Sequence, residues 1–357
     1  MDYEEIMERE LESLGPEGLD QLTEMGREAL GDRLSLGDVL HGLLTGESSL
    51  NAEDLWQAVL ELFLGEVWSA VELGAQILLI CVVMGLLHSL SSGFGGSGAS
   101  GIAIMVCNCA AVALCLREFV SVYAICGDAV DTTATVMQIL LPIMVPLLLA
   151  MGSPATAGIL NPAILAAVTV FAGIVHRIVL PLLFLSCVLF LGDCLSEKHY
   201  VKKLAGFFRT LGVFSMGLCV TLFTGLTVIR GLFTKTADGL LMRTARYSVD
   251  HFVPLVGSFA ADSLEMVLRC TATIKNGVGI FGVVVILALL VTPLLKLAAT
   301  ALVFKLSGAL AEPIGSGSAA DCLNEIGNTV LLLGAVLLLE TILFLVFLAV
   351  LINISVA

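Results

Sequence analysis

The chain has 357 residues, of which 58% are hydrophobic and 13% are charged, and its mean hydropathy is +1.03. A soluble globular domain is usually about 45 to 50% apolar and about 25% charged, so this composition excludes a soluble protein and predicts an integral membrane protein. The net charge of −14 lies entirely in residues 1–66, which hold seventeen acidic residues and three arginines. Such an acidic segment argues against nucleic acid or an anionic lipid surface as its partner.

Residues 1–66 are predicted to form a small acidic helical segment. Apolar residues recur at near-helical spacing in 2–14, 19–30 and 35–46, and glycine or glycine–proline follows each run. These thin apolar stripes bury little surface alone, so we expect the segment to dock on a partner. The first residues lack the basic and apolar regions of a secretory signal.

The segment 67–229 is predicted to be a membrane body of about six spans. Residues 70–90 and 102–116 are expected to form the first two spans, with the second ended by Arg117 and Glu118. From about 137 to 191, five prolines interrupt the apolar runs and predict kinked helices that pack against protein, with a wet cavity as the alternative. These prolines are Pro142, Pro146, Pro154, Pro162 and Pro181.

The segment 193–210 is the densest basic region of the chain, with Lys198, Lys202, Lys203 and Arg209. The positive-inside rule predicts that it is cytoplasmic. Five crossings before it would place the acidic N-terminus on the outer side of the membrane.

A polar module is predicted at 230–276, because ten charged residues gather there between charge-free apolar runs. We expect two amphipathic helices joined through Pro254 and Gly257, with Arg243, Arg246 and Asp250 on one face of the first. A partner-binding surface and a pair of helices lying at the lipid headgroups explain the pattern about equally well. Residues 277–357 then form a C-terminal pair of membrane helices.

Glu340 lies ten residues inside the last apolar run. A carboxylate there costs about 2.5 kcal/mol or more on insertion scales, so it should face protein and find a partner. Lys296 is the first candidate partner and Lys305 the second. A buried pair that fixes helix order is the favoured interpretation, and an ion or proton site is the alternative.

No catalytic or cofactor motif is present. The sequence has no phosphate-binding loop, zinc-protease motif, nucleophile elbow or dinucleotide fingerprint, and its five histidines are scattered. Most of the ten cysteines lie in apolar runs without a CxxC pair, which favours packing over metal or redox chemistry. We therefore expect no enzyme, no metal and no cofactor.

Several pieces of the sequence resemble the stage III sporulation protein AE family of endospore-forming bacteria. They are LPIMVPLLLAMGSPATAG at 141–158, LPLLFLS at 180–186, KLSGALAEPIG at 305–315, CLNEIGN at 322–328 and the polar module, and the resemblance covers Trp68 to the C-terminus. Members of that family typically carry a cleavable secretory signal, which is not visible here. The module residues that the resemblance marks as family-motif and partner-surface candidates are Asp238, Gly239, Arg243, Thr244, Arg246, Tyr247, Pro254, Gly257, Lys275 and Asn276.

The resemblance implies a component of the channel or secretion-like complex that links mother cell and forespore and supports late forespore gene expression. It implies location in the mother-cell-derived membrane around the forespore, and partners among the membrane proteins and the ATPase of the same operon. The resemblance does not decide whether the chain also forms a homo-oligomer. The alternative is an independent permease for a small solute, with Glu340 and Lys296 as coupling charges. Either function predicts an all-α polytopic protein with about seven or eight transmembrane helices, several of them kinked by proline or glycine.

Overall fold

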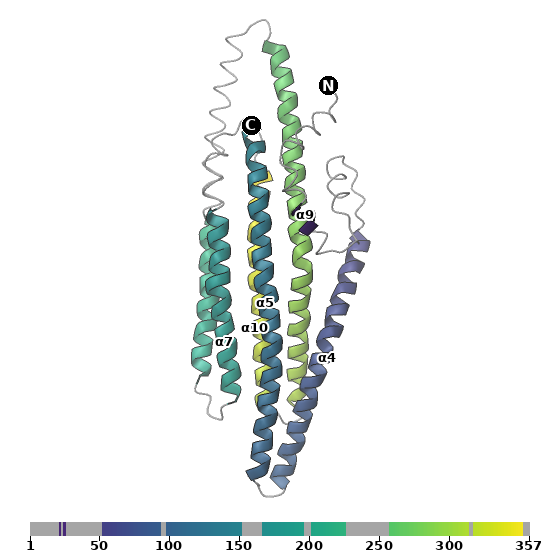
Figure 1. Cartoon of the computed structure of the whole chain (residues 1–357), viewed down its shortest axis with the longest axis vertical. Helices are drawn as coiled ribbons and strands as arrows, with labels where there is room; N and C mark the ends of the chain where they lie inside the picture. The colour runs from purple at the N-terminus through teal and green to yellow at the C-terminus, as the bar shows by residue number, and fades with distance from the viewer. Residues whose placement is uncertain are drawn as a thin grey trace.

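The computed structural model describes residues 21–22, 24–25, 52–93, 98–151, 166–195, 201–225, 257–313 and 317–352. Within these ranges the regular elements are helices and no strand occurs, which confirms the predicted all-α class. The elements are α4 (Ala52–Gly93), α5 (Gly98–Ala150), a helix at 166–174 that continues through the π-helix η2 (Val175–Val179) into α7 (Leu180–Cys194), a helix at 202–225, α9 (Gly257–Ala311) and α10 (Gly317–Ile352). Figure 1 shows them as one elongated bundle.

Six of the described helices are long and apolar enough to cross a membrane. They are Phe63–Leu86, Ile102–Ala150, Ala166–Cys194, Lys202–Gly225, Thr271–Ala311 and Ala319–Ile352. The predicted seven or eight spans are therefore not confirmed in the described residues. A helix of 53 residues such as α5 is about 80 Å long, whereas the hydrocarbon core of a bilayer is about 30 Å thick, so parts of the longest helices extend beyond it.

The prediction that a span ends at Arg117 and Glu118 is wrong, because α5 continues without a break to Ala150. Buried residues recur through the charged interval at helical spacing, as Phe119, Val122 and Cys126 show. The charged and polar side chains of the interval occupy the other side of the same helix. A helix therefore continues where a count of polar residues alone predicts a loop.

The prolines of this region do not all interrupt helices. Pro142 and Pro146 lie inside α5, and both are exposed. Pro181 lies inside the continuous helix 166–194, directly after the π-helix η2, and lacks the N–H that an α-helix would donate to the Arg177 carbonyl. Pro154 and Pro162 lie outside the described residues.

The expected boundary between the polar module and the C-terminal pair falls inside α9, which begins at Gly257 and runs on through Asn276 to Ala311. Asn276 is exposed, but Lys275 is only 1% exposed. The Lys275 ammonium donates a hydrogen bond of 2.9 Å to the Ile352 carbonyl. Lys275 thus binds a carbonyl at the C-terminal end of α10, where a cation is favourable, rather than standing on an exposed partner surface.

Close contacts hold α5, α9 and α10 together. A Cβ at Gly282 of α9 would lie 2.5 Å from Leu140 of α5, and one at Gly279 would lie 2.4 Å from Ile352 of α10. Side chains at these two glycines would force the helices apart, so small residues set their spacing, as is common in membrane bundles. The buried core of the described bundle is overwhelmingly apolar.

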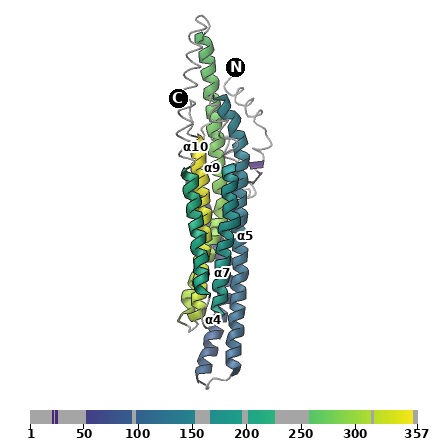
Figure 2. The same ribbon diagram turned by 90° about the vertical axis from the view of Figure 1, so that its left-hand side faces the viewer.

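Successive membrane helices alternate in direction (Figures 1 and 2). Three candidate spans precede the basic segment that follows α7, rather than the five that were predicted. Three is also an odd number, so the basic segment and the start of the first span still lie at opposite ends of the bundle. The count of five is thus not confirmed in the described residues, and its consequence for the relative sides of these two segments is unchanged.

Candidate intramembrane charge site

Glu340 lies in the span of α10 and is completely buried, and neither of its carboxylate oxygens has a hydrogen-bond partner. The predicted pair with Lys296 is therefore not formed. Lys296 adjoins Leu297, which packs against Gly334, and this register leaves Lys296 about one and a half turns along α10 from Glu340. Lys305, the second candidate, packs against Gly327, 13 residues before Glu340 in the chain and thus about 20 Å away along the helix.

The packing of α10 against α5 brings Asp131 of α5 near the buried Glu340. The two helices run in the same direction, and the Cys126 thiol donates a 3.7 Å hydrogen bond to the Leu333 carbonyl. Asp131 lies five residues beyond Cys126 on α5, and Glu340 lies seven residues beyond Leu333 on α10. The two side chains are therefore at similar depths in the bundle. Both groups are carboxyls, so the interaction is repulsive when both are ionised.

His176 adds an imidazole to this pair. Its Nδ1 lies 3.2 Å from Asp131 Oδ1, and the His176 and Asp131 side chains are 43% and 63% exposed. The geometry does not satisfy a hydrogen bond, although the distance is that of an ion pair. The ring also lies beside Gly127 of α5, where a Cβ would be 3.6 Å from Cε1, so the absence of a side chain there admits the imidazole.

His176 occupies the π-helix η2. A π-turn inserts one residue and changes the direction of the side chains that follow, and such turns are frequent at functional sites. Nothing in the local sequence VHRIV indicates this turn, so the sequence analysis did not place His176 beside Asp131.

An aromatic cluster lies one turn beyond Glu340. Phe344 contacts the rings of Phe171 and Phe223, with centroid separations of 5.9 and 6.5 Å, and Phe223 also contacts Phe347 at 6.1 Å. Glu340 therefore has an apolar cluster beside it on α10, whereas Asp131 and His176 are partly exposed. We refer to Asp131, His176 and Glu340 as the intramembrane charge site.

An ionised carboxylate without a partner is costly in apolar surroundings, so Glu340 requires a proton or another cation in this position. In the described part of the chain, no three histidine, cysteine, aspartate or glutamate side chains gather closely enough to hold a metal ion. Two carboxyls and an imidazole at this depth can bind and transfer a proton, as such groups do in pumps and transporters.

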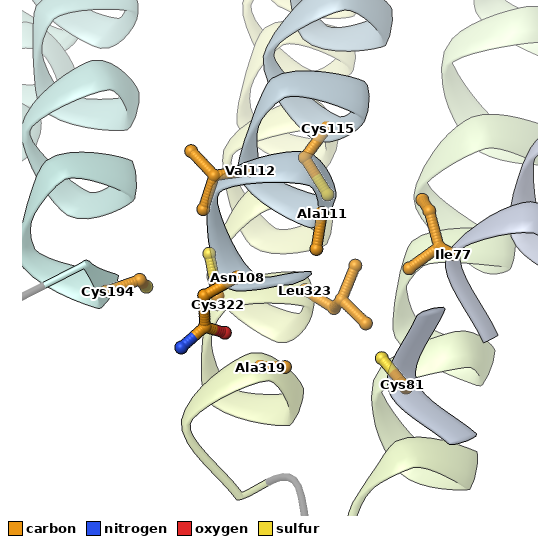
Figure 3. Close-up of a pocket in the computed structure, with 10 residues that line it drawn as sticks. All are labelled: Ile77, Cys81, Asn108, Ala111, Val112, Cys115, Cys194, Ala319, Cys322 and Leu323. Atoms are coloured by element: carbon orange, nitrogen blue, oxygen red, sulfur yellow. The ribbon is translucent and has the colours of Figure 1, made fainter. Parts of the chain in front are cut away.

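A second feature of the bundle is a cavity lined by cysteines from four helices (Figure 3). These are Cys81 of α4, Cys115 of α5, Cys194 of α7 and Cys322 of α10. The cavity has a volume of about 10 Å³, which is room for about one water molecule. The Cys194 and Cys322 side chains both line the cavity, and the remaining lining is mostly apolar. The cysteines thus meet in packing between helices, in agreement with the role expected from the sequence.

The CLNEIGN segment contributes an ion pair that the sequence analysis did not find. Glu325 accepts a hydrogen bond of 2.9 Å from Arg209 of the 202–225 helix, and both side chains are about 30% exposed. The partners are 116 residues apart, so no local spacing reveals them. Gly327 of the same segment lies under Lys305, where a Cβ would be 2.9 Å from the lysine side chain.

Most of the module residues marked by the family resemblance lie outside the described residues. These are Asp238, Gly239, Arg243, Thr244, Arg246, Tyr247 and Pro254. Gly257 begins α9, and the positions of Lys275 and Asn276 are given above.

The six apolar helices of the described residues define the chain as a polytopic α-helical membrane protein. The family model for stage III sporulation protein AE matches residues 34–355, and the chain belongs to that family. It is 26% identical over 310 residues to the stage III sporulation protein AE of Bacillus subtilis (strain 168), covering 87% of this chain and 78% of the relative. No solved structure matches the chain.

Proposed function

We propose that the chain is a membrane component of the channel or secretion-like complex between mother cell and forespore, required for late forespore gene expression. The observation that carries this proposal is the family match over residues 34–355, which includes all six candidate spans. The likeness therefore extends over the whole described membrane body.

In this proposal the chain has no catalytic role and needs no cofactor. It lies in the mother-cell-derived membrane around the forespore, with its acidic segment 1–66 outside the cytoplasm. The partners are other membrane proteins and the ATPase of the same operon. The odd number of spans before the basic segment after α7 supports this orientation, because the positive-inside rule makes that segment cytoplasmic.

The test is deletion of the gene in its spore-forming host, with a reporter of late forespore transcription. The deletion strain should fail to activate the reporter, and the wild-type gene should restore it. An affinity-tagged chain should co-purify with the operon products from sporulating cells. Normal reporter activity in the deletion strain, or purification without any operon product, would contradict the proposal.

The second candidate is an independent permease, and one specific observation favours it. Glu340 is buried without a hydrogen-bond partner near Asp131 and His176, as a proton-coupling group would be. A solute that raises the unfolding temperature of the purified chain, and does so less in Glu340→Gln, would favour the permease. Co-purification of the chain with the operon products favours the channel component.

A further inference from the structure

One face of α5 is polar in the middle of its span. Between residues 117 and 138 the exposed side chains are mostly charged or polar, with only Val120 and Ala124 as exceptions. The exposed residues of α5 at 102–113 and at 142–150 are apolar apart from Cys109. We call this surface the polar face of α5 and define it as Arg117, Ser121, Asp128, Asp131, Thr135 and Gln138.

The polar face forms a continuous seam. With Ala124 added and Val120 left out, successive positions of the polar face from Arg117 to Gln138 are separated alternately by four and three residues. This is the heptad spacing by which one helix keeps the same side toward a neighbouring helix. Pro142 removes the N–H that would normally bind the Gln138 carbonyl, which leaves a further polar group at the end of the seam.

The polar face lies at the same depth as a surface suited to lipid. The rings of Phe119 in α5 and Phe184 in α7 are 5.8 Å apart, and Ser186 of α7 donates to the Ala205 carbonyl at 2.9 Å. At the other end of this layer, Asp131 contacts His176. Phe171, which lies five residues before His176, contacts Phe223 of the 202–225 helix. Residues 117–131 of α5 and 205–223 therefore span the same layer of the bundle.

Within that layer the helix at 202–225 presents large apolar side chains outward. They include Phe207, Leu211, Phe214, Leu218 and Leu222. Its exposed Thr210 and Thr221 hydroxyls donate to carbonyls one turn earlier, which satisfies them without water. Figure 2 shows α5 along one edge of the bundle and this helix toward the opposite edge.

Hydrocarbon cannot solvate both surfaces equally. The side chains of Arg117, Asp128 and Asp131 are exposed, and each costs about 2.5 to 3.5 kcal/mol at the bilayer centre on insertion scales. At the depth where Leu211 and Leu218 face lipid, the polar face must therefore meet protein or water. Water that solvates the polar face cannot be enclosed within a single chain. The described core is packed with apolar side chains, and the polar face lies outside that core.

A second copy of this chain offers a complementary surface. Ser69, Glu72 and Gln76 of α4 are exposed and share one face of that helix. The cysteine cavity places Ile77 and Cys81 beside Ala111 and Cys115, so Glu72 and Arg117 lie within about one helical turn of each other in depth. Copies inserted in the same direction can therefore place Glu72 of one against Arg117 of the next.

We propose that the polar face of α5 lines a water-filled path where copies of this chain meet, with α4 of one copy against α5 of the next. The contact is head-to-tail, and a head-to-tail contact that closes gives a ring around the path. The inference deepens the proposed function, on which it rests, by assigning the path of a channel component to one helix face.

Water access is tested with single introduced cysteines in membranes from sporulating host cells, on a full-length background in which all ten native cysteines are replaced by serine or alanine. Ser121→Cys and Ala124→Cys lie on the polar face, and Leu211→Cys is the matched control at the same depth on the 202–225 helix. A membrane-impermeant methanethiosulfonate should modify the first two at least about tenfold faster than the control, since the thiolate forms only in contact with water. Rates as slow as that of Leu211→Cys in correctly inserted protein would overturn the proposal.

The contact between copies is tested by co-expressing two differently tagged chains, one Glu72→Cys and the other Arg117→Cys. Mild oxidation with copper phenanthroline should give a disulfide dimer that carries both tags, which excludes a bond within one chain. Leu211→Cys paired with Glu72→Cys should give none. A cross-link only to a different protein would overturn the second copy as the occupant of this face.

These measurements separate the inference from the proposed function. Water access and cross-linking do not depend on spore yield, whereas the proposed function is tested by deletion and complementation. A dry polar face in a strain whose sporulation requires the chain overturns the inference alone. A wet, cross-linked face in a strain that sporulates without the chain overturns the proposed function instead.

Discussion

Lys275 and Glu340 are two ionisable side chains buried in the membrane body, with exposures of 1% and 0%. Lys275 donates a hydrogen bond to the Ile352 carbonyl, whereas the Glu340 oxygens have no hydrogen-bond partner. A buried polar group that is bonded contributes to the fold, and one that is not bonded lowers stability and requires another explanation. The difference indicates a structural role for Lys275 and leaves Glu340 as the candidate functional group.

The largest effect on stability is expected for Lys275→Met. This change keeps most of the side-chain volume but removes the donor to a carbonyl at the end of α10. Leaving a buried polar group without its partner costs about 1 to 3 kcal/mol, so the unfolding midpoint of the purified chain should fall clearly. Asn276→Ala, at the exposed neighbouring position, is the control and should change little. Equal midpoints for the two variants would remove the structural role of Lys275.

A smaller effect is expected for Arg209→Gln, which breaks the ion pair with Glu325 between the 202–225 helix and α10. Both side chains are about 30% exposed, so solvent screening limits the loss to about 0.2 to 1 kcal/mol. A double-mutant cycle of Arg209→Gln with Glu325→Gln measures the coupling energy between the two side chains. A loss of stability as large as that of Lys275→Met would mean that the difference in burial between Arg209 and Lys275 does not set the size of their contributions.

The sequence predicts part of this comparison. Composition alone identifies the membrane class, and the depth of Glu340 in an apolar run correctly indicates burial in protein. The predicted pairing of Glu340 with Lys296 does not form. The register of α9 against α10 depends on contacts such as Leu297 with Gly334, which no sequence spacing reveals. Lys275 was assigned to a partner surface because the family resemblance includes it in the polar module, although α9 turns it toward Ile352.

The continuity of α5 was missed for a related reason. Arg117 and Asp128 suggest a loop when residues are counted along the chain, but they share one side of a helix whose other side carries Phe119 and Cys126. The periodicity was present in the sequence and was outweighed by the expectation that a span must be apolar all round. The π-turn at His176 left no such pattern.

The smallest effect on stability, and the most informative, is expected for Glu340→Gln. The amide has nearly the shape of the carboxyl, and no hydrogen bond to a protein group is lost, because none is made. The unfolding midpoint and membrane level should therefore stay near those of the wild type, while late forespore gene expression falls toward the level of the deletion strain. Asp131→Asn is the companion variant, because it removes the nearby charge without changing the buried group.

The two variants can also be compared by their reaction with a hydrophobic carbodiimide, which modifies protonated carboxyl groups within membranes. Modification of the wild type at Glu340 should be absent in Glu340→Gln and should persist in Asp131→Asn. If Glu340→Gln instead lowers the unfolding midpoint as far as Lys275→Met does and supports normal sporulation when expressed, then Glu340 is a structural group like Lys275. The contrast between the bonded and the unbonded charge would then carry no functional meaning, and the intramembrane charge site would reduce to a detail of helix packing.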